Sequence, residues 1–264
     1  PPFDRVVATM TAELCDCYPS KRVGVCSIVD AVEEAFGERE PLIWGVDGAF
    51  HRPEQIRQNP IVAAAANWLA LAMVAASLQP DRPGILIDIG STTTDLIPLD
   101  RGAVAVQGRS DRARLTTGEL VYAGVRRTPV CALATALPLA DKVPVGLAAE
   151  LFATTLDLFL VLGEIAPDPA SLATADGRAA TPELARIRLA RMVGDDGEGF
   201  SHDDATALAR SARESLMHRL VAAAKRVCDA TIGRPEFAVV AGSGEFLAMD
   251  LARKLLDEEA PILS

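Results

Sequence analysis

The sequence lacks an excess of positive charge. Its 264 residues include 26 Lys and Arg against 36 Asp and Glu, which gives a formal net charge of −10 at pH 7. A protein that binds the nucleic-acid backbone needs a basic surface, so the charge argues against this class of partner. A single phosphate group is still a suitable ligand, because a few backbone amides and one arginine are enough to bind it.

Cysteine is sparse, and two common catalytic motifs are absent. The five cysteines are an odd number, and no histidine follows Cys15, Cys17 and Cys26 at zinc-finger spacing. We therefore expect reduced thiols and a cytoplasmic protein. No Gly-x-Ser-x-Gly elbow or Walker A loop occurs, which argues against a serine hydrolase or a P-loop enzyme.

A membrane span and a signal peptide are not expected. Residues 61–78 carry no charge, but 8 of them are alanine and Asn67 lies in the middle. This composition favours a helix buried between a sheet and a neighbouring domain over a membrane span. The chain starts with Pro-Pro-Phe-Asp-Arg, without a methionine or a charged leader, so we expect it to begin in the middle of a protein.

The order of the predicted elements is that of an α/β protein. Half of the residues are apolar, which is ample for a core. The pattern predicts strands at 6–9, 41–46, 85–89, 95–99, 103–107 and 237–241. It predicts the start of one helix around residues 11–17. Further helices are predicted at 27–36, 53–78 (broken near Pro60), 205–232 and 245–258. Between them we expect a Pro-rich domain connector at 79–84, a polar, basic excursion at 109–128 and a mostly helical insertion.

Residues 85–99 are the most informative segment. An apolar strand carries Asp88 near its end and then opens into Gly90, Ser91, Thr92 and Thr93. Such a turn offers backbone N–H groups and hydroxyls to an anion, and glycine lets the main chain approach closely. Because a carboxylate can hold Mg²⁺, the segment predicts a phosphate or diphosphate site. The alternative is an ordinary hairpin with a Thr-rich tip.

The spacing also predicts a pair of carboxylates. If Ser91 and Thr92 are the two central residues of the turn, Asp88 lies opposite Asp95 on the paired strand. Two carboxylates that close need a cation between them or one shared proton. We therefore expect a divalent metal held by Asp88 and Asp95, provided that the turn is two residues long.

Three further segments are candidates for the same ligand. Gly242, Ser243 and Gly244 follow a strand and start a helix, whose N-terminus attracts anions. Thr9, Thr11 and Glu13 follow the first strand, at the edge where α/β sheets bind ligands. The third segment, 116–129, contains Gly118, Glu119, Tyr122, Arg126 and Arg127. Arginine suits phosphate contacts and tyrosine can stack on a ring. The simpler alternatives are a strand–helix turn, a helix cap at Thr11 and a solvated loop.

Several of these segments resemble known proteins. Residues 88–95 and 242–244 are similar to the second phosphate motif and the adenosine motif of the acetate and sugar kinase, Hsp70 and actin superfamily. Residues 9–14, 118–130 and 173–177 are similar to hydantoinase/oxoprolinase-related proteins of tetrahydromethanopterin-linked one-carbon metabolism. That group includes an enzyme family of methanofuran biosynthesis.

The resemblance implies an actin-like ATPase (ribonuclease H-like) fold with two lobes. The lobes would be residues 1–82 and 83–264, the second with a helical insertion at about 130–233. The family begins with another strand and an Asp-x-Gly-Gly motif that is followed closely by a lysine. This sequence contains no such motif, so we expect the first lobe to lack its N-terminal strands through truncation.

The resemblance also implies a reaction. A transferase of this family joins an aminomethylfuran diphosphate to a glutamyl-tyramine or tyrosine phenol and releases diphosphate, with Mg²⁺ as cofactor. Mg²⁺ would bind Asp88 and Asp95, and the phosphates would bind the turn at 90–93 with Arg126 and Arg127. Candidate general bases are Glu119 and Glu13. The residues expected to contact substrate or nucleotide are Thr9, Thr11, Gly118, Tyr122, Gly242, Ser243 and Gly244.

Two other functions fit the same motifs. One is an ATP-dependent kinase or an oxoprolinase/hydantoinase-type hydrolase, and the other is a non-catalytic nucleotide-binding subunit in one-carbon metabolism. In each case the expected partner is a small phosphate-bearing molecule, and a homodimer is a further expectation.

Overall fold

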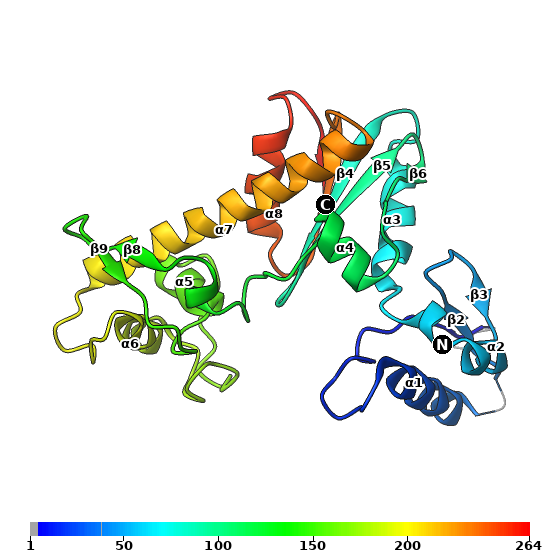
Figure 1. Cartoon of the computed structure of the whole chain (residues 1–264), viewed down its shortest axis with the longest axis horizontal. Coiled ribbons are helices and arrows are strands. Elements are labelled where there is room, and N and C mark those ends of the chain that lie inside the picture. The colour runs from blue at the N-terminus through cyan, green and yellow to red at the C-terminus, as the bar shows by residue number, and fades with distance from the viewer. Residues whose placement is uncertain (1–4, 38) are drawn as a thin grey trace.

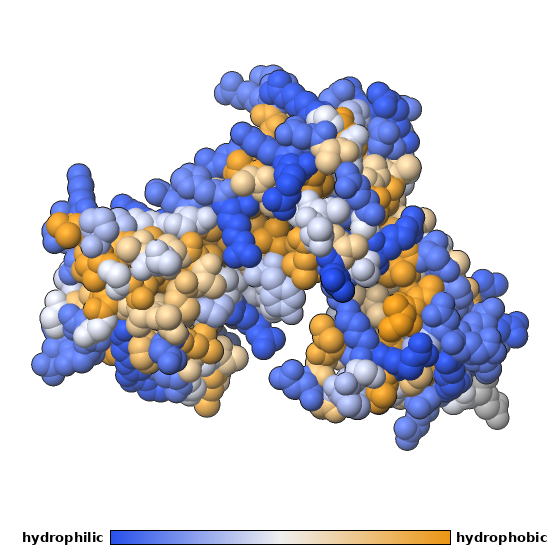
Figure 2. Space-filling model, in the orientation of Figure 1, coloured by the Kyte–Doolittle hydropathy of each residue, from blue (hydrophilic) through white to orange (hydrophobic). Residues whose placement is uncertain are grey.

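The computed structural model of the chain describes residues 5–37 and 39–264. Figure 1 shows three parts, which are an N-terminal part, a central sheet with helices on both faces, and an insertion. The insertion and the N-terminal part extend from the central sheet in different directions, and Figure 2 shows a notch between them on this face of the molecule.

The N-terminal part contains a three-stranded sheet in the order β1 (Val7–Ala8), β2 (Leu42–Trp44), β3 (Phe50–His51). β1 and β2 are parallel, and β2 and β3 are antiparallel. The sheet packs against α1 (Lys21–Phe36), α2 (Pro53–Gln58) and the 3-10 helix η1 (Pro60–Ala63). The break expected near Pro60 is confirmed, because α2 ends at Gln58 and the next α-helix begins at Asn67.

The helix expected to start around 11–17 is not formed. Residues 11–20 make turns and bends, and α1 begins at Lys21, six residues before the expected start at Ser27. Pro19 explains part of this difference, because the residue before a proline is pushed out of the helical conformation. Ser20 then caps α1, since its hydroxyl accepts a hydrogen bond from the backbone N–H of Val23 at 3.3 Å.

The central sheet has the order β11 (Ile262–Leu263), β10 (Phe237–Ala241), β4 (Pro83–Ile89), β5 (Thr94–Asp100), β6 (Ala103–Val104), and β7 (Leu120–Val121) also pairs with β5. β10 is parallel to β4 and β11, whereas β4, β5 and β6 form an antiparallel meander. The expected meander is confirmed, although β6 ends at Val104 and not at Gln107. The Pro-rich connector is shorter than expected, because β4 already begins at Pro83.

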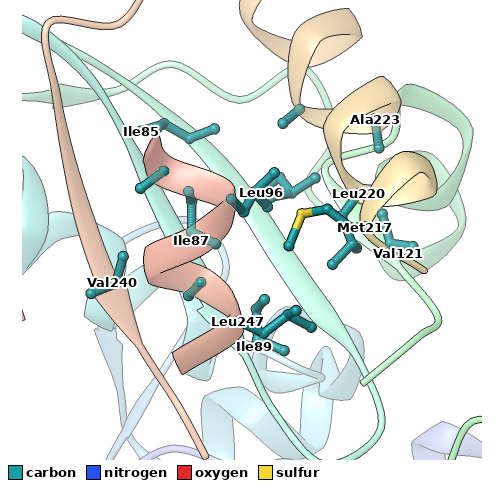
Figure 3. Close-up of a cluster of buried hydrophobic side chains, with 14 of the residues drawn as sticks. Ile85, Ile87, Ile89, Leu96, Val121, Met217, Leu220, Ala223, Val240 and Leu247 are labelled. Atoms are coloured by element: carbon teal, nitrogen blue, oxygen red, sulfur yellow. The ribbon is translucent and has the colours of Figure 1, made fainter. Parts of the chain in front are cut away.

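Helices cover both faces of this sheet. On one face α3 (Asn67–Leu78) packs Trp68 and Leu69 against Leu86 and Ile97. On the other, α7 (His202–Thr231) and α8 (Glu245–Leu255) pack against the side chains of alternate β4 residues, as Figure 3 shows. Because side chains alternate across a strand, Asp88 lies on the face of Leu86, which is the face that α3 covers.

The segment 109–128, expected as a polar excursion, forms regular structure. It contains α4 (Asp111–Thr117), which Ser110 caps and Gly118 ends in a left-handed conformation with φ 93°. The strand β7 follows α4. The side chain of Arg114 in α4 is 2% exposed, so part of this basic segment belongs to the interior.

The insertion is less helical than expected. It contains η2 (Val130–Ala132), a hairpin of β8 (Ala136–Pro138) and β9 (Pro144–Gly146), α5 (Thr155–Leu162), α6 (Pro182–Met192) and the first half of α7. A buried ion pair joins two of its helices, since Arg188 Nε donates to Asp157 Oδ1 at 2.7 Å. Arg188 Nη1 also donates to Asp176 at 3.1 Å, so the segment 173–177 contributes to the structure of the insertion.

Across the described residues, no helix combines the length and the apolar character that a membrane crossing requires. The uncharged stretch 61–78 instead forms η1 and α3. One face of α3 is buried against the central sheet as expected, whereas Met73 and Val74 on its other side are exposed.

Candidate functional site

The predicted turn after β4 has the expected length. Asp88 pairs with Asp95 in the β4–β5 register, and Ile89 pairs with Thr94. The backbone N–H of Gly90 donates to the carbonyl of Thr93 at 2.9 Å, so Ser91 and Thr92 are the two central residues. Within the described residues the backbone N–H groups of Ser91, Thr92 and Thr93 donate no hydrogen bond. They are available to an anion, as the composition of the turn predicted.

A second chain segment supports this turn from behind. The N–H groups of Arg126 and Arg127 donate to the carbonyl of Ser91 at 3.0 and 2.9 Å. Gly124 makes the contact possible, because a Cβ at this position would lie 2.4 Å from the carbonyl oxygen of Gly90. Sequence reasoning did not single out Gly124, although it lies within the segment 118–130 that carries the family resemblance.

The turn forms one wall of a cavity of about 570 Å³. Thr11 and Leu14 of the N-terminal part form the opposite wall, together with Cys15 and Asp16, so the cavity lies between the N-terminal part and the central sheet. Tyr122 and Arg127 also line it. Arg127 makes no ion pair within the described part of the chain, which leaves its guanidinium available to an anionic ligand.

Arg126, the second predicted phosphate ligand, is exposed and does not line this cavity. Among the described residues its side chain makes no hydrogen bond to the turn, although its backbone N–H supports the turn. The structure therefore brings Arg127, Thr11 and Tyr122 to the turn, and it separates Arg126 from them.

Asp88 and Asp95 lie side by side but have different partners. Arg114 Nη2 donates to Asp95 Oδ1 at 2.7 Å, and the guanidinium of Arg114 lies 4.0 Å from the centre of the Trp68 ring. Burial raises the pKa of Asp95, although the charge of Arg114 acts in the opposite direction. Burial and the neighbouring charge of Asp95 both raise the pKa of Asp88, for which the described residues supply no hydrogen-bond or ion-pair partner.

Arg114 changes the interpretation of the carboxylate pair. We expected the two aspartates to need a metal or a shared proton, whereas the structure supplies a buried guanidinium to Asp95. Asp95 already has a cationic partner, whereas Asp88 has none among the described residues and is the carboxylate that is suited to a metal. The position of Arg114 on α4 could have been found only by recognising that the basic excursion forms a helix.

No group of three or more His, Cys, Asp or Glu side chains that could hold a metal ion occurs in the described ranges 5–37 and 39–264. Mg²⁺ commonly binds through one or two carboxylates, with water and phosphate oxygens as the other ligands. The unpartnered Asp88 beside an anion-binding turn fits that donor set. A single carboxylate does not fit structural zinc, which takes four protein ligands.

A smaller cavity of about 200 Å³ adjoins the first. It shares Thr11, Leu14, Thr93 and Tyr122 with the larger cavity, and it is further lined by Glu13, Asp95 and Arg114 among others. Glu13 is 2% exposed, and its Oε2 has no hydrogen-bond partner. Burial raises the pKa of Glu13, while backbone hydrogen bonds from Glu13 and Ala65 and the charge of Lys21 oppose the shift.

Several predicted residues line neither cavity, among them Asp88, Arg126 and residues 242–244. Glu119 is 1% exposed, and its two oxygens accept hydrogen bonds from the backbone N–H groups of Gln107 and Gly108 at 2.6 and 3.0 Å. It holds a loop, and this corrects its assignment as a base. Gly118 ends α4 and packs against Arg226, and Thr9 lines a separate apolar groove with Trp44.

The turn formed by Gly242, Ser243 and Gly244 lies against the end of β4. A Cβ at Gly242, where φ is 90°, would lie 2.4 Å from Asp88 Oδ1, and the N–H of Gly244 donates to the carbonyl of Ile89 at 2.8 Å. The turn is therefore close to Asp88, but none of its residues lines the cavity at Ser91 and Thr92.

Comparison with known proteins identifies the family. The sequence pattern described as Hydantoinase/oxoprolinase matches residues 4–258. The chain belongs to the hydantoinase/oxoprolinase family. The resemblance that the separate sequence segments indicated is thereby confirmed.

Two curated relatives carry the name (4-{4-[2-(gamma-L-glutamylamino)ethyl]phenoxymethyl}furan-2-yl)methanamine synthase. The protein of Methanocaldococcus jannaschii is 38% identical over 201 residues, which are 76% of this chain and 60% of that protein. The protein of Methanococcus vannielii is 32% identical over 175 residues, which are 66% of this chain and 77% of that protein. This chain thus spans well under the full length of these family members.

Among solved structures, the nucleotide-free structure of acetone carboxylase resembles the chain with a TM-score of 0.55 and 14% identity. The similarity covers 91% of this chain and 36% of acetone carboxylase. It shows a common mixed α/β fold, as the sequence predicted, whereas the division into two lobes stays a prediction.

Proposed function

We propose that this member of the hydantoinase/oxoprolinase family is a transferase that joins an aminomethylfuran diphosphate to the phenol of a glutamyl-tyramine and releases diphosphate. The observation that carries the proposal is the cavity at Ser91 and Thr92, where amides without partners face the same space as Arg127. A site of this kind suits a diphosphate. The names of the two relatives describe a product with the corresponding phenoxymethylfuran ether.

The reaction makes one bond and breaks one bond. The phenol oxygen forms a bond to the furfuryl carbon, while the bond from that carbon to the diphosphate oxygen breaks and its electron pair leaves with the diphosphate. The proton of the phenol is taken up by the departing diphosphate, so atoms and charge balance. The main demands on the protein are positioning of the two reactants and stabilisation of the leaving group.

Different residues of this chain meet these demands. The turn amides and Arg127 bind the diphosphate, and Asp88 holds Mg²⁺, which when bound neutralises charge on the leaving group. Tyr122, which is 57% exposed and lines both cavities, offers a ring face to the flat furan or phenol. Arg114 keeps Asp95 paired, so that Asp88 carries the unneutralised charge of the two aspartates.

A direct assay separates this function from ATP chemistry. The chain would be incubated with Mg²⁺, the aminomethylfuran diphosphate and glutamyl-tyramine, and in parallel with Mg²⁺ and ATP. We expect diphosphate release together with an ether product detected by mass spectrometry, and no release of phosphate from ATP. Turnover of ATP without any response to the furan would contradict the proposal and favour an ATP-dependent kinase or hydrolase.

A further inference from the structure

The two adjoining cavities have opposite chemistry. The larger one presents the turn amides and the guanidinium of Arg127, which suit an anion. The smaller one is rich in carboxylates, because Glu13, Asp95 and Asp111 all line it. A ligand that occupies both cavities at once would therefore be negative at one end and positive at the other.

Charge pairing in the smaller cavity leaves one carboxylate over. Lys21 contacts Asp111 in an ion pair, and Arg114 pairs with Asp95 at 2.7 Å. Within residues 5–37 and 39–264, Glu13 has no ion-pair partner, and its Oε2 is buried without any hydrogen bond. Burying an acceptor without a partner is unfavourable, and more so for a charged group, so a ligand that donates a hydrogen bond to this oxygen would be stabilised.

The backbone around Glu13 is also held in an uncommon conformation. Ala65, which lines the same cavity and hydrogen-bonds to Glu13, has φ 48°, in the left-handed region that residues with a side chain rarely adopt. Backbone strain of this kind is often found at binding sites. The neighbouring Asn67 begins α3 and lines the cavity together with Trp68.

We propose that Glu13 binds the primary ammonium group of the furan substrate, and that the smaller cavity is a specificity pocket for an aminomethyl arm on a flat ring. This proposal rests on the proposed function, because it assigns the two ends of the same substrate. The diphosphate lies in the larger cavity on the turn and Arg127, and the furan passes Tyr122, which lines both cavities.

The size and chemistry of the smaller cavity support an ammonium over other ligands. At about 200 Å³ it is several times the roughly 30 Å³ that one water occupies, so it can hold a five-membered ring with a one-carbon arm. A second phosphate would meet the unpaired carboxyl group of Glu13 there, beside Asp95 and Asp111, whose cationic partners are already engaged, and this disfavours an anion. An ammonium group donates up to three hydrogen bonds, and it would give Glu13 a positively charged partner.

The test compares two substrates in two proteins. Wild-type and Glu13→Gln chains would be assayed with the aminomethylfuran diphosphate and with the same furfuryl diphosphate without its amine. We expect the wild type to bind the amine-bearing substrate roughly 10- to 100-fold better, as judged by KM, and Glu13→Gln to lose most of this preference. The amine-free substrate is the reference in each chain, and the preference is the ratio of the two KM values.

Two further variants control the comparison. Glu13→Asp keeps the charge and should restore part of the preference, whereas Glu34→Gln removes an exposed carboxylate on α1 and should leave it unchanged. If Glu13→Gln lowers kcat equally for both substrates without a change in KM, Glu13 acts as a base or a structural residue and the inference is wrong.

Binding of furfurylamine, measured by calorimetry without any diphosphate, distinguishes this inference from the proposed function. Binding to the wild type that is lost in Glu13→Gln would support the ammonium pocket even if no ether product forms. Equal binding to both chains, or binding to neither, would overturn the inference and would leave the proposed function to its own assay.

Discussion

At the scale of single residues, the carboxylates in and around the site differ in their hydrogen-bond and ion-pair partners. Asp95 pairs with Arg114, and Glu119 accepts two backbone hydrogen bonds. Among the described residues, Glu13 has a buried oxygen without a hydrogen-bond partner, and Asp88 has neither a hydrogen-bond partner nor an ion-pair partner. The two unsatisfied groups, and not the buried and satisfied Glu119, are the ones that a ligand can complete.

Glu13 is expected to make stability depend on pH. The pKa of Glu13 in the folded chain is raised above its pKa in the unfolded chain. At pH values between these two pKa values, the folded state therefore binds one more proton than the unfolded state. The free energy of unfolding therefore falls as pH rises from about 4.3, the value of an unperturbed glutamate, through the raised pKa. Lys21, Arg114, Asp95 and Asp111 surround the group, and their charges enter the same balance.

The measurement is urea denaturation of ligand-free wild type and Glu13→Gln at several pH values. Because glutamine does not titrate, the variant should become the more stable of the two as pH rises, and the difference should level off above the pKa of Glu13. A variant that is increasingly destabilised at higher pH would show that the structure favours the charged form of Glu13.

Asp88 is expected to control the response to Mg²⁺. Asp88→Asn removes the carboxylate proposed to hold the ion and should lower turnover by about 10²–10³-fold, the cost of removing one group that stabilises developing charge. The fold should be intact by circular dichroism, since a desolvated charge is removed. Asp100→Asn, at the exposed far end of β5, is the matched control and should keep wild-type turnover and Mg²⁺ dependence. Full activity in Asp88→Asn would exclude a metal-centred role.

At the scale of elements, the site depends on the contact between the turn after β4 and the segment 124–127. Gly124→Ala should disrupt it, because the added Cβ would lie 2.6 Å from the backbone nitrogen of Thr92 as well as 2.4 Å from the oxygen of Gly90. Both are backbone atoms, so the turn or the segment must shift. Misplacement of about 1 Å can cost roughly 10²-fold in rate, so we expect a loss of that order in turnover and weaker diphosphate binding.

Gly146→Ala in β9 is the control for this change, because a Cβ there meets nothing within 4 Å. It should keep wild-type turnover and diphosphate affinity, both measured beside Gly124→Ala by the ether assay and by calorimetry. Wild-type affinity in Gly124→Ala would show that the contact does not shape the anion site.

The hairpin could be predicted from the sequence, whereas α4 could not. The β4–β5 hairpin followed from an apolar strand and a Gly-containing turn, which are local signals, and the assumption of a two-residue turn placed Asp88 opposite Asp95 correctly. The segment 109–128 has no clear apolar period, so neither α4 nor the buried Arg114 was expected. The structural role of Glu119 was also not predicted. Its partners Gln107 and Gly108 contact it only after the chain folds back, which no local sequence signal indicates.

At the scale of the whole molecule, the proposed site is made where two parts of the chain meet. Thr11 and Leu14 come from the N-terminal part, and the turn and Tyr122 come from the central sheet and its β7 edge. The sequence indicated each segment but not that 11–16 would face the turn, because that depends on how α3 and the N-terminal part pack on the sheet. Of the described residues that line either cavity, none belongs to the insertion.

The central claim is that the chain transfers a furfuryl group by cleavage of the bond between carbon and oxygen. The most direct measurement uses an aminomethylfuran diphosphate with ¹⁸O in the bridging oxygen between carbon and phosphorus, followed by mass spectrometry of both products. We predict that all of the ¹⁸O appears in the released diphosphate and none in the ether. Label that stays with the furan would mean that a phosphorus–oxygen bond is cleaved, as in a kinase or phosphatase, and would contradict the account.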